Sequence, residues 1–182
     1  MRARAPGTSS RTRWRSAMPS KGGSMTMHVG AQAAEGDALL EPRRVLLDTN
    51  ILLDYLDARR SEHDTARWLV RAILSRGGAP VAPASSYKDV YYILRRSLGG
   101  EKDARALVRG LVECVPISPI ELRGADLAPA VASDEPDFED GLVRQLAERE
   151  RLAAIVTRDA SAFRSSFVPV FTPQEMLGLL SG

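Results

Sequence analysis

The chain has 182 residues, of which 44% are hydrophobic and 26% are charged, which is ordinary usage for one globular domain. No run approaches the roughly 18 consecutive apolar residues of a membrane-spanning helix, so a membrane-embedded protein is excluded. One cysteine and two histidines exclude an internal disulfide framework and a multi-cysteine zinc site.

The net charge of +2 is the sum of two unlike parts. Residues 1–24 contain six basic residues and no acid, which leaves 19 basic and 23 acidic residues for the rest of the chain. A basic extension is therefore joined to a mildly acidic body. The overall charge is not by itself evidence that the protein binds nucleic acid.

Gly, Ser, Pro, Arg and Ala dominate residues 1–42, where apolar residues show neither helical nor strand periodicity. Such a segment buries too little apolar surface to offset its chain entropy, which predicts a disordered basic extension. Three interpretations stay open. The start can be assigned too far upstream, with Met25 or Met27 as the true first residue. The segment can be a tail that helps to hold RNA, or an organellar transit peptide, whose composition it resembles.

From residue 43 onward, short apolar runs alternate with segments of helical periodicity. The apolar runs predict strands at 45–47, 80–83, 114–118, 154–157 and 168–171. The periodic segments predict helices at 49–57, 61–76, 85–98, 101–112, 120–132, 137–151 and 173–180. Cys114 has apolar neighbours and is expected to be buried. The alternation predicts an α/β fold, a three-layer sandwich with a mainly parallel central sheet flanked by helices.

Four aspartates stand where such a fold would bring them together. Asp48 ends the first strand and Asp159 follows the strand at 154–157, so both are expected at the same edge of the sheet. Asp140 shares the apolar stripe of its helix, and Asp89 borders the inward face of another helix. The carboxyl ends of parallel strands are where ligands bind, so these four acids are the candidate site.

Each acid also has a purely structural interpretation. Asp48 can cap the following helix, and Asp137 and Asp140 can be first-turn acids that the helix dipole favours. Asp89 can be a surface acid paired with a neighbouring base, and Asp159 can be an ordinary loop residue. Taken together, these interpretations leave the convergence of the acids without a cause.

Converging carboxylates require either raised pKa values or a cation. Two like charges 4 Å apart repel by roughly 4 kcal/mol at an effective dielectric constant near 20. Oxygen ligands favour hard ions such as Mg²⁺ or Mn²⁺, which activate water and neutralise charge on a phosphodiester. The acids therefore predict metal-dependent hydrolysis of a phosphate ester.

Four segments, in this order, resemble the motifs of the PIN domain family. They are Leu46-Leu47-Asp48-Thr49-Asn50, Ser86-Tyr87-Lys88-Asp89-Val90-Tyr91-Tyr92-Ile93-Leu94, Asp137-Phe138-Glu139-Asp140 and Val156-Thr157-Arg158-Asp159. The resemblance covers about residues 43–182 and implies a PIN-like nuclease domain with metal-dependent ribonuclease activity. Many members of the family are VapC-type toxins, so the resemblance also implies the toxin of a toxin–antitoxin pair.

The resemblance implies an acidic quartet that binds Mg²⁺ or Mn²⁺ and carries out catalysis: Asp48, Asp89, Asp140 and Asp159. The second acid is often Glu in the family. Because Asp is one carbon shorter, Asp89 is expected to reach a metal through water. Thr49, Asn50 and Thr157 are implied to orient the quartet.

Asp137 is an extra acid that either joins the site or caps its helix. Lys88 and Arg158 are candidate contacts for RNA phosphates. Arg95 and Arg96 can also contact RNA phosphates, but they are interpreted as solvated charges. Tyr91 and Tyr92 can stack on bases, but a pair of tyrosines on an inward-leaning helix favours the interpretation as core residues.

Two other functions compete with the nuclease. A haloacid-dehalogenase-like phosphatase also begins with an Asp after the first strand, but it needs a second Asp where this chain has Asn50. A non-catalytic PIN-like module that binds RNA or protein is the second alternative. The expected partners are an RNA substrate, a cognate antitoxin and a second copy of the chain, with Trp68 as a candidate dimer or antitoxin surface. We expect a cytoplasmic location without membrane contact.

Overall fold

The structure is a computed structural model, and it describes residues 44–182. The predictions for residues 1–42 lie outside the described residues. The strands are β1 (Arg44–Leu47), β2 (Ala79–Pro83), β3 (Ser118–Ile120), β4 (Ala154–Val156) and β5 (Val170–Phe171). The helices are α2 (Thr49–Leu56), α3 (His63–Ser75), α4 (Ala84–Ser97), α5 (Glu101–Cys114), α6 (Gly124–Val131), α7 (Phe138–Arg149) and α8 (Pro173–Ser181), with a 3-10 turn η1 (Ala160–Phe163).

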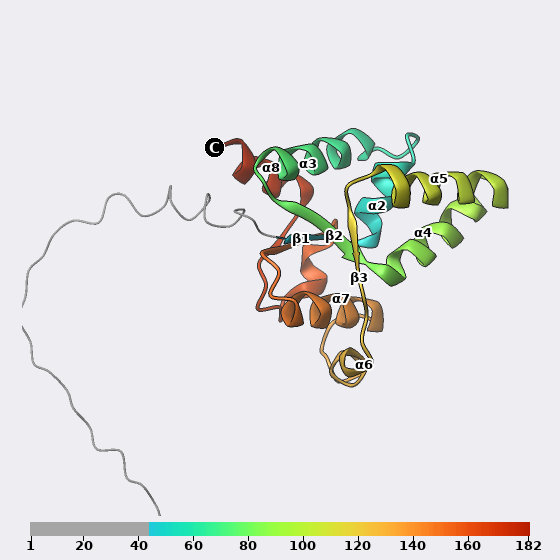
Figure 1. Cartoon of the computed structure of the whole chain (residues 1–182). Helices are drawn as coiled ribbons and strands as arrows, with labels where there is room; N and C mark the ends of the chain where they lie inside the picture. Colours follow the sequence, from blue (N-terminus) through green and yellow to red (C-terminus); the bar gives the residue numbers. More distant parts are fainter. Residues whose placement is uncertain (1–43) are drawn as a thin grey trace, which may run out of the picture.

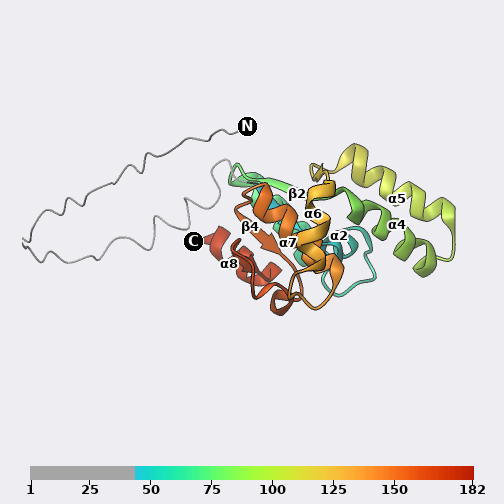
Figure 2. The ribbon, with the colours of Figure 1, turned by 90° about the horizontal axis from the view of Figure 1, so that it is seen from below.

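The described strands form one sheet in the order β3-β2-β1-β4-β5, and every neighbouring pair is parallel. In Figure 1, α3 and α8 lie on one side of the sheet and α7 and α6 lie on the other. Viewed from below, α6 and α7 lie side by side in front of the sheet, while α4 and α5 extend away from it (Figure 2). The predicted three-layer α/β sandwich is confirmed.

Strand β1 shows why both faces of the sheet are covered. Val45 and Leu47 point into the core formed with α2, α3, α4, α5 and α8, while Leu46 points into the core formed with α7. All three side chains are buried, as expected for a central parallel strand with helices on both faces. Burial of Val143 and Leu146 on α7 fixes which side of that helix faces the sheet.

The boundary near Cys114 differs from the prediction. Helix α5 continues through Cys114, whose side chain is exposed rather than buried as predicted. Strand β3 begins only at Ser118. Pro116 explains the boundary because the residue before a proline is driven out of the helical region, and Val115 is extended. The predicted helix at 120–132 is also shorter, since Ile120 still pairs with Pro83 in the sheet.

A bilayer-spanning helix would need more length and apolar character than any helix of residues 44–182 has.

Candidate functional site

Asp48 stands at the carboxyl end of β1 and caps α2. Its side chain accepts hydrogen bonds from the backbone N–H of Thr49 at 2.6 Å, from Asn50 Nδ2 at 2.6 Å and from Thr157 Oγ1 at 2.8 Å. Burial raises the pKa of Asp48, and these three hydrogen bonds oppose that rise by stabilising the carboxylate. Both interpretations of Asp48 therefore apply, because the helix cap is also a buried acid at the sheet edge.

Thr157 and Asn50 join the ends of β1 and β4. Asn50 Nδ2 lies 3.3 Å from Thr157 Oγ1, and Thr157 Oγ1 accepts from the backbone N–H of Asp159 at 3.1 Å. The backbone N–H of Arg158 donates to Asn50 Oδ1 at 3.2 Å. These contacts fix the orientation of Asp48 relative to the turn that carries Asp159, which is the supporting geometry expected for Asn50 and Thr157.

The start of α7 brings a second group of acids to the same place. Asp137 caps the helix, because its Oδ1 accepts from the backbone N–H of Asp140 at 2.9 Å. Burial first, and then the charges of Asp137, Asp48, Glu139 and Asp159, raise the pKa of Asp140 to about 7. The charges of acids from the end of β1, from α7 and from the turn after β4 therefore all act on Asp140.

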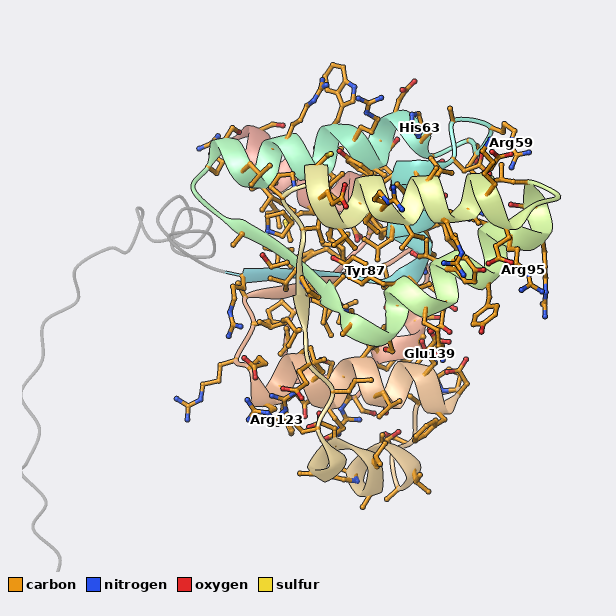
Figure 3. The ribbon with its side chains drawn as sticks, turned by 45° about the vertical axis from the view of Figure 1, so that its right-hand side comes forward. Arg59, His63, Tyr87, Arg95, Arg123 and Glu139 are labelled. Carbon is orange, nitrogen blue, oxygen red and sulfur yellow. The ribbon has the colours of Figure 1, made fainter. Side chains whose placement is uncertain are left out.

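Glu139 belongs to this group, although the sequence did not single it out. Its Oε1 lies 3.3 Å from Thr49 Oγ1, which in turn lies 2.8 Å from the buried Ser86 Oγ of α4. Burial, followed by the charges of Asp89 and Asp48, raises the pKa of Glu139. In Figure 3, Glu139 lies on the side of α7 that faces α4. Glu139 stands four residues before the buried Val143, a spacing that was available in the sequence.

Asp89 is carried on α4, and its charge acts on Glu139. Lys88 Nζ lies 3.3 Å from Asp89 Oδ1, which is the pairing expected of a surface acid. The structure thus places Asp89 beside the acids of α7 and also gives it a basic neighbour. The second candidate RNA contact, Arg158, has its Nη1 3.4 Å from Oδ1 of the fully buried Asp54.

The acids have few cations to balance them. Within residues 44–182, no ion pair involves Asp48, Asp137, Glu139, Asp140 or Asp159, and Lys88 is the ion-pair partner of Asp89. Across the same residues, no three Asp, Glu, His or Cys side chains are gathered into a ready-made metal site. The donor set nevertheless suits a hard divalent cation, because it consists of carboxylate and hydroxyl oxygens that carry excess negative charge.

Comparison with known proteins adds a family and a curated relative. A family model described as PIN domain matches residues 44–161, which is more than half of the chain. "Ribonuclease VapC1" of Aquifex aeolicus (strain VF5) is 26% identical over 141 residues, covering 75% of this chain and 94% of that protein.

Two solved structures share the fold. The chain matches the structure of VapBC2 from Rickettsia felis bound to a DNA fragment from its promoter, with a TM-score of 0.56, 12% identity, and coverage of 71% of this chain and 98% of that chain. It matches FitAcB from Neisseria gonorrhoeae with a TM-score of 0.54, 20% identity and the same coverage of both chains. At these identities the likeness concerns the fold.

Proposed function

Because the chain belongs to the PIN domain family, we propose that it is an endoribonuclease whose nuclease domain spans about residues 43–182. The proposal is supported by the group of acids around Asp140. Burial and the charges of the neighbouring acids raise the pKa of Asp140 to about 7. A fold gains nothing in stability from gathering acids that lack ion-pair partners, since like charges repel one another. Binding of a cation and a phosphodiester at this edge of the sheet would account for the arrangement of the acids.

Asp48, Asp89, Asp140 and Asp159 are the residues that would hold Mg²⁺ or Mn²⁺, with Asp137 and Glu139 as further oxygen ligands within the group. When bound, such an ion neutralises charge on the phosphodiester and increases the acidity of water near it. The likeness to a protein named as a ribonuclease supports RNA as the substrate.

The chain's own residues prepare the site. Thr157 and Asn50 hold the carboxylate of Asp48 in one orientation. Thr49 links Glu139 to α4 through the hydroxyl of Ser86. Because the pKa of Asp140 is raised to about 7, its carboxyl keeps a proton over much of the range below pH 7, and its carboxylate becomes available to a cation at neutral pH and above.

A calorimetric titration of the full chain with Mn²⁺ tests the metal site. The wild-type protein is expected to bind the ion, and Asp48→Asn is expected to lose that binding because it removes a charged ligand. Asp103→Asn, on the exposed surface of α5, is the matched control and is expected to bind like the wild type. The same three proteins are then compared for cleavage of single-stranded RNA. Equal binding by wild type and Asp48→Asn would place the ion elsewhere.

We further propose that the protein is the toxin of a toxin–antitoxin pair and forms a homodimer. The fold shared with VapBC2, which was solved with promoter DNA, supports a partnership with an antitoxin. Induced expression is expected to arrest growth with the wild-type chain and not with Asp159→Asn. Sedimentation of the purified chain tests the homodimer. Unimpaired growth with the wild-type chain would contradict the toxin proposal and leave the ribonuclease proposal standing.

A non-catalytic binding module is the second candidate. The absence of a preassembled three-ligand site within residues 44–182 favours it. It predicts RNA or protein binding that is independent of Mn²⁺ and unchanged in Asp48→Asn, so the titration above separates the two functions.

A further inference from the structure

One face of α4 combines positive charge with an exposed aromatic ring. Lys88, Tyr92, Arg95 and Arg96 recur at spacings of three and four residues, so they share one face of the helix. All four side chains are exposed, and 49% of the Tyr92 surface is accessible, which corrects its interpretation as a core residue. Figure 3 shows Arg95 projecting outward from α4, far from the central sheet.

Tyr92 is held as a platform rather than as a loose surface group. The Arg95 guanidinium carbon lies 5.8 Å from the centroid of the Tyr92 ring, in cation–π contact. The ring of Tyr91 meets it edge to face, with 5.2 Å between centroids and 71° between planes. These two contacts restrict the Tyr92 side chain while about half of its surface stays open to solvent.

The charges on this face are only partly balanced. Lys88 pairs with Asp89 at 3.3 Å. Among residues 44–182, neither Arg95 nor Arg96 forms an ion pair, whereas Arg105 on the neighbouring α5 is paired with Glu101. The face therefore presents available cations on a body whose net charge is negative, and an anionic ligand would complement it.

The face begins at the acid group. Ser86, two residues before Lys88 on α4, lies 2.8 Å from the Thr49 hydroxyl, which in turn lies 3.3 Å from Glu139 Oε1. At 1.5 Å per residue, the helix carries the face from Lys88 to Arg96 over about 12 Å. A chain of phosphates leaving the acid group along α4 would meet Lys88 first, then Tyr92, and then the two arginines.

We propose that this face, formed by Lys88, Tyr92, Arg95 and Arg96, binds the single-stranded RNA that flanks the cleaved bond. A base stacks on Tyr92, and the arginines contact phosphates. The proposal rests on the proposed ribonuclease function and names where the substrate strand lies. An aromatic ring on a helix surface stacks only on a base that is free of its own helix, which favours a single strand over a duplex.

The binding experiment uses the full chain in the Asp159→Asn background, to prevent cleavage, and a fluorescein-labelled single-stranded RNA 12-mer. Fluorescence anisotropy is expected to show that Tyr92→Ala weakens binding by about 5- to 150-fold, the range given by 1–3 kcal/mol per stacked base. Tyr92→Phe keeps the ring and is expected to bind like the parent. The duplex form of the same RNA is expected to bind equally well to Tyr92→Ala and to the parent.

Arg96→Ala tests the phosphate contacts. It is expected to make the plot of log affinity against log salt concentration less steep by about 0.7, the value for one phosphate on a single strand. Arg71→Ala, at an exposed arginine of α3 that forms no ion pair within residues 44–182, is the matched control and is expected to leave the slope unchanged.

Cleavage of the same 12-mer by proteins that retain Asp159 separates the two proposals. If the wild-type chain cuts the RNA and Tyr92→Ala cuts it with an unchanged KM, the substrate-strand proposal is wrong and the ribonuclease proposal stands. If the wild-type chain neither binds nor cuts RNA, both fail. If Tyr92→Ala binds RNA normally but changes the sedimentation of the chain, this face is a protein interface and the proposal is also overturned.

Discussion

The acidic side chains at the two ends of α7 differ in whether arginines neutralise them. At the N-terminal end, Asp137, Glu139 and Asp140 form no ion pair within the described residues, and burial with mutual repulsion raises the pKa of Asp140 to about 7. Toward the C-terminal end, acidic side chains form ion pairs with arginines of the helix. The unpaired Glu139 and Asp140 and the two arginines all lie on this one helix of 12 residues.

The C-terminal half of α7 carries Arg144 and Arg149. Arg144 lies 2.8 Å from Glu135, whose side chain is only 1% exposed, and 3.0 Å from Glu148. Arg149 lies 2.8 Å from Asp126 of α6. Burial acts to raise the pKa of Asp126, but the hydrogen bonds from Arg149 and from a backbone N–H outweigh it, so the pKa is lowered.

The acids near the C-terminal end of α7 support the fold, whereas the acids at its N-terminal end are suited to binding a ligand. For Asp126, which pairs with Arg149, the ionised form contributes to stability, since the pKa falls below its ordinary value. Where acids face only one another, the ionised site costs stability until a cation arrives. The N-terminal end of α7 is thus the part of the helix that is suited to function.

Removing one charge from the acids that lack ion-pair partners is expected to affect the protein most. Asp159→Asn is expected to reduce RNA cleavage by about a thousand-fold or more, because it removes a charged ligand for the ion. The fold is expected to persist, since Asn can replace Asp as the cap of the η1 turn, where Asp159 Oδ1 accepts from the backbone N–H of Ser161. Cleavage kinetics and circular dichroism measure the two effects. Undiminished cleavage would remove Asp159 from the site.

At the paired end, the expected effect is on stability. Arg144→Met leaves Glu135 buried without its cation, which is expected to lower the free energy of unfolding by about 3 kcal/mol. Urea denaturation of the full chain measures the loss. Arg105→Met, whose partner Glu101 lies on the exposed surface of α5, is the control and is expected to cost much less. Equal losses in both variants would show that burial of the partner is not what matters.

A divalent cation is expected to act only on the unpaired end. Mg²⁺ at about 100 times its dissociation constant stabilises the folded chain by about 2.7 kcal/mol if it binds the native state alone. The thermal midpoint of the wild-type chain is expected to rise accordingly, with no rise for Asp48→Asn. Arg144→Met, provided that it folds, is expected to gain as much as the wild type. An equal rise in Asp48→Asn would separate the ion from the acids.

The same comparison shows which parts of the site were predictable from the sequence. The meeting of Asp48 and Asp159 follows from the parallel arrangement of β1 and β4, because the carboxyl ends of parallel strands share one edge. The role of Glu139 does not follow as readily. Glu139 and Asp140 stand four and three residues before the buried Val143, so periodicity alone leaves both facing the sheet.

Tyr92 was mispredicted for a related physical reason. Its helix has apolar residues in more directions than the core can cover, and only the packing of α5 against α4 decides which of them are buried. The same is true of Cys114, whose helix continued further than its local sequence indicated. The strands and their parallel arrangement were accessible from pattern, whereas the choice between neighbouring positions on a helix depended on tertiary packing.

The smallest expected effect concerns the proton on Asp140. Because the pKa of Asp140 is about 7 in the folded chain and 3.8 ordinarily, the folded state binds more protons than the unfolded state between these values. The free energy of unfolding of the metal-free wild type is therefore expected to fall as pH rises from about 4 to 7. Asp140→Asn abolishes this contribution, so after allowance for solvent screening it is expected to stabilise the chain by about 1 kcal/mol at pH 7.5 and by roughly 0.4 kcal/mol at pH 5.

Urea denaturation in the presence of a chelator, at the two pH values, measures this difference. Asp134→Asn is a useful contrast, because a hydrogen bond from Ser165 is the main cause that lowers the pKa of Asp134. Its removal is expected to have the opposite sign, and to destabilise the chain equally at pH 7.5 and pH 5, because the stability from a lowered pKa is complete above pH 3.8 and is lost only below it. If Asp140→Asn proved destabilising at pH 7.5, the acids at the start of α7 would be a source of stability, and the two ends of the helix would not differ in the way their ion pairs indicate.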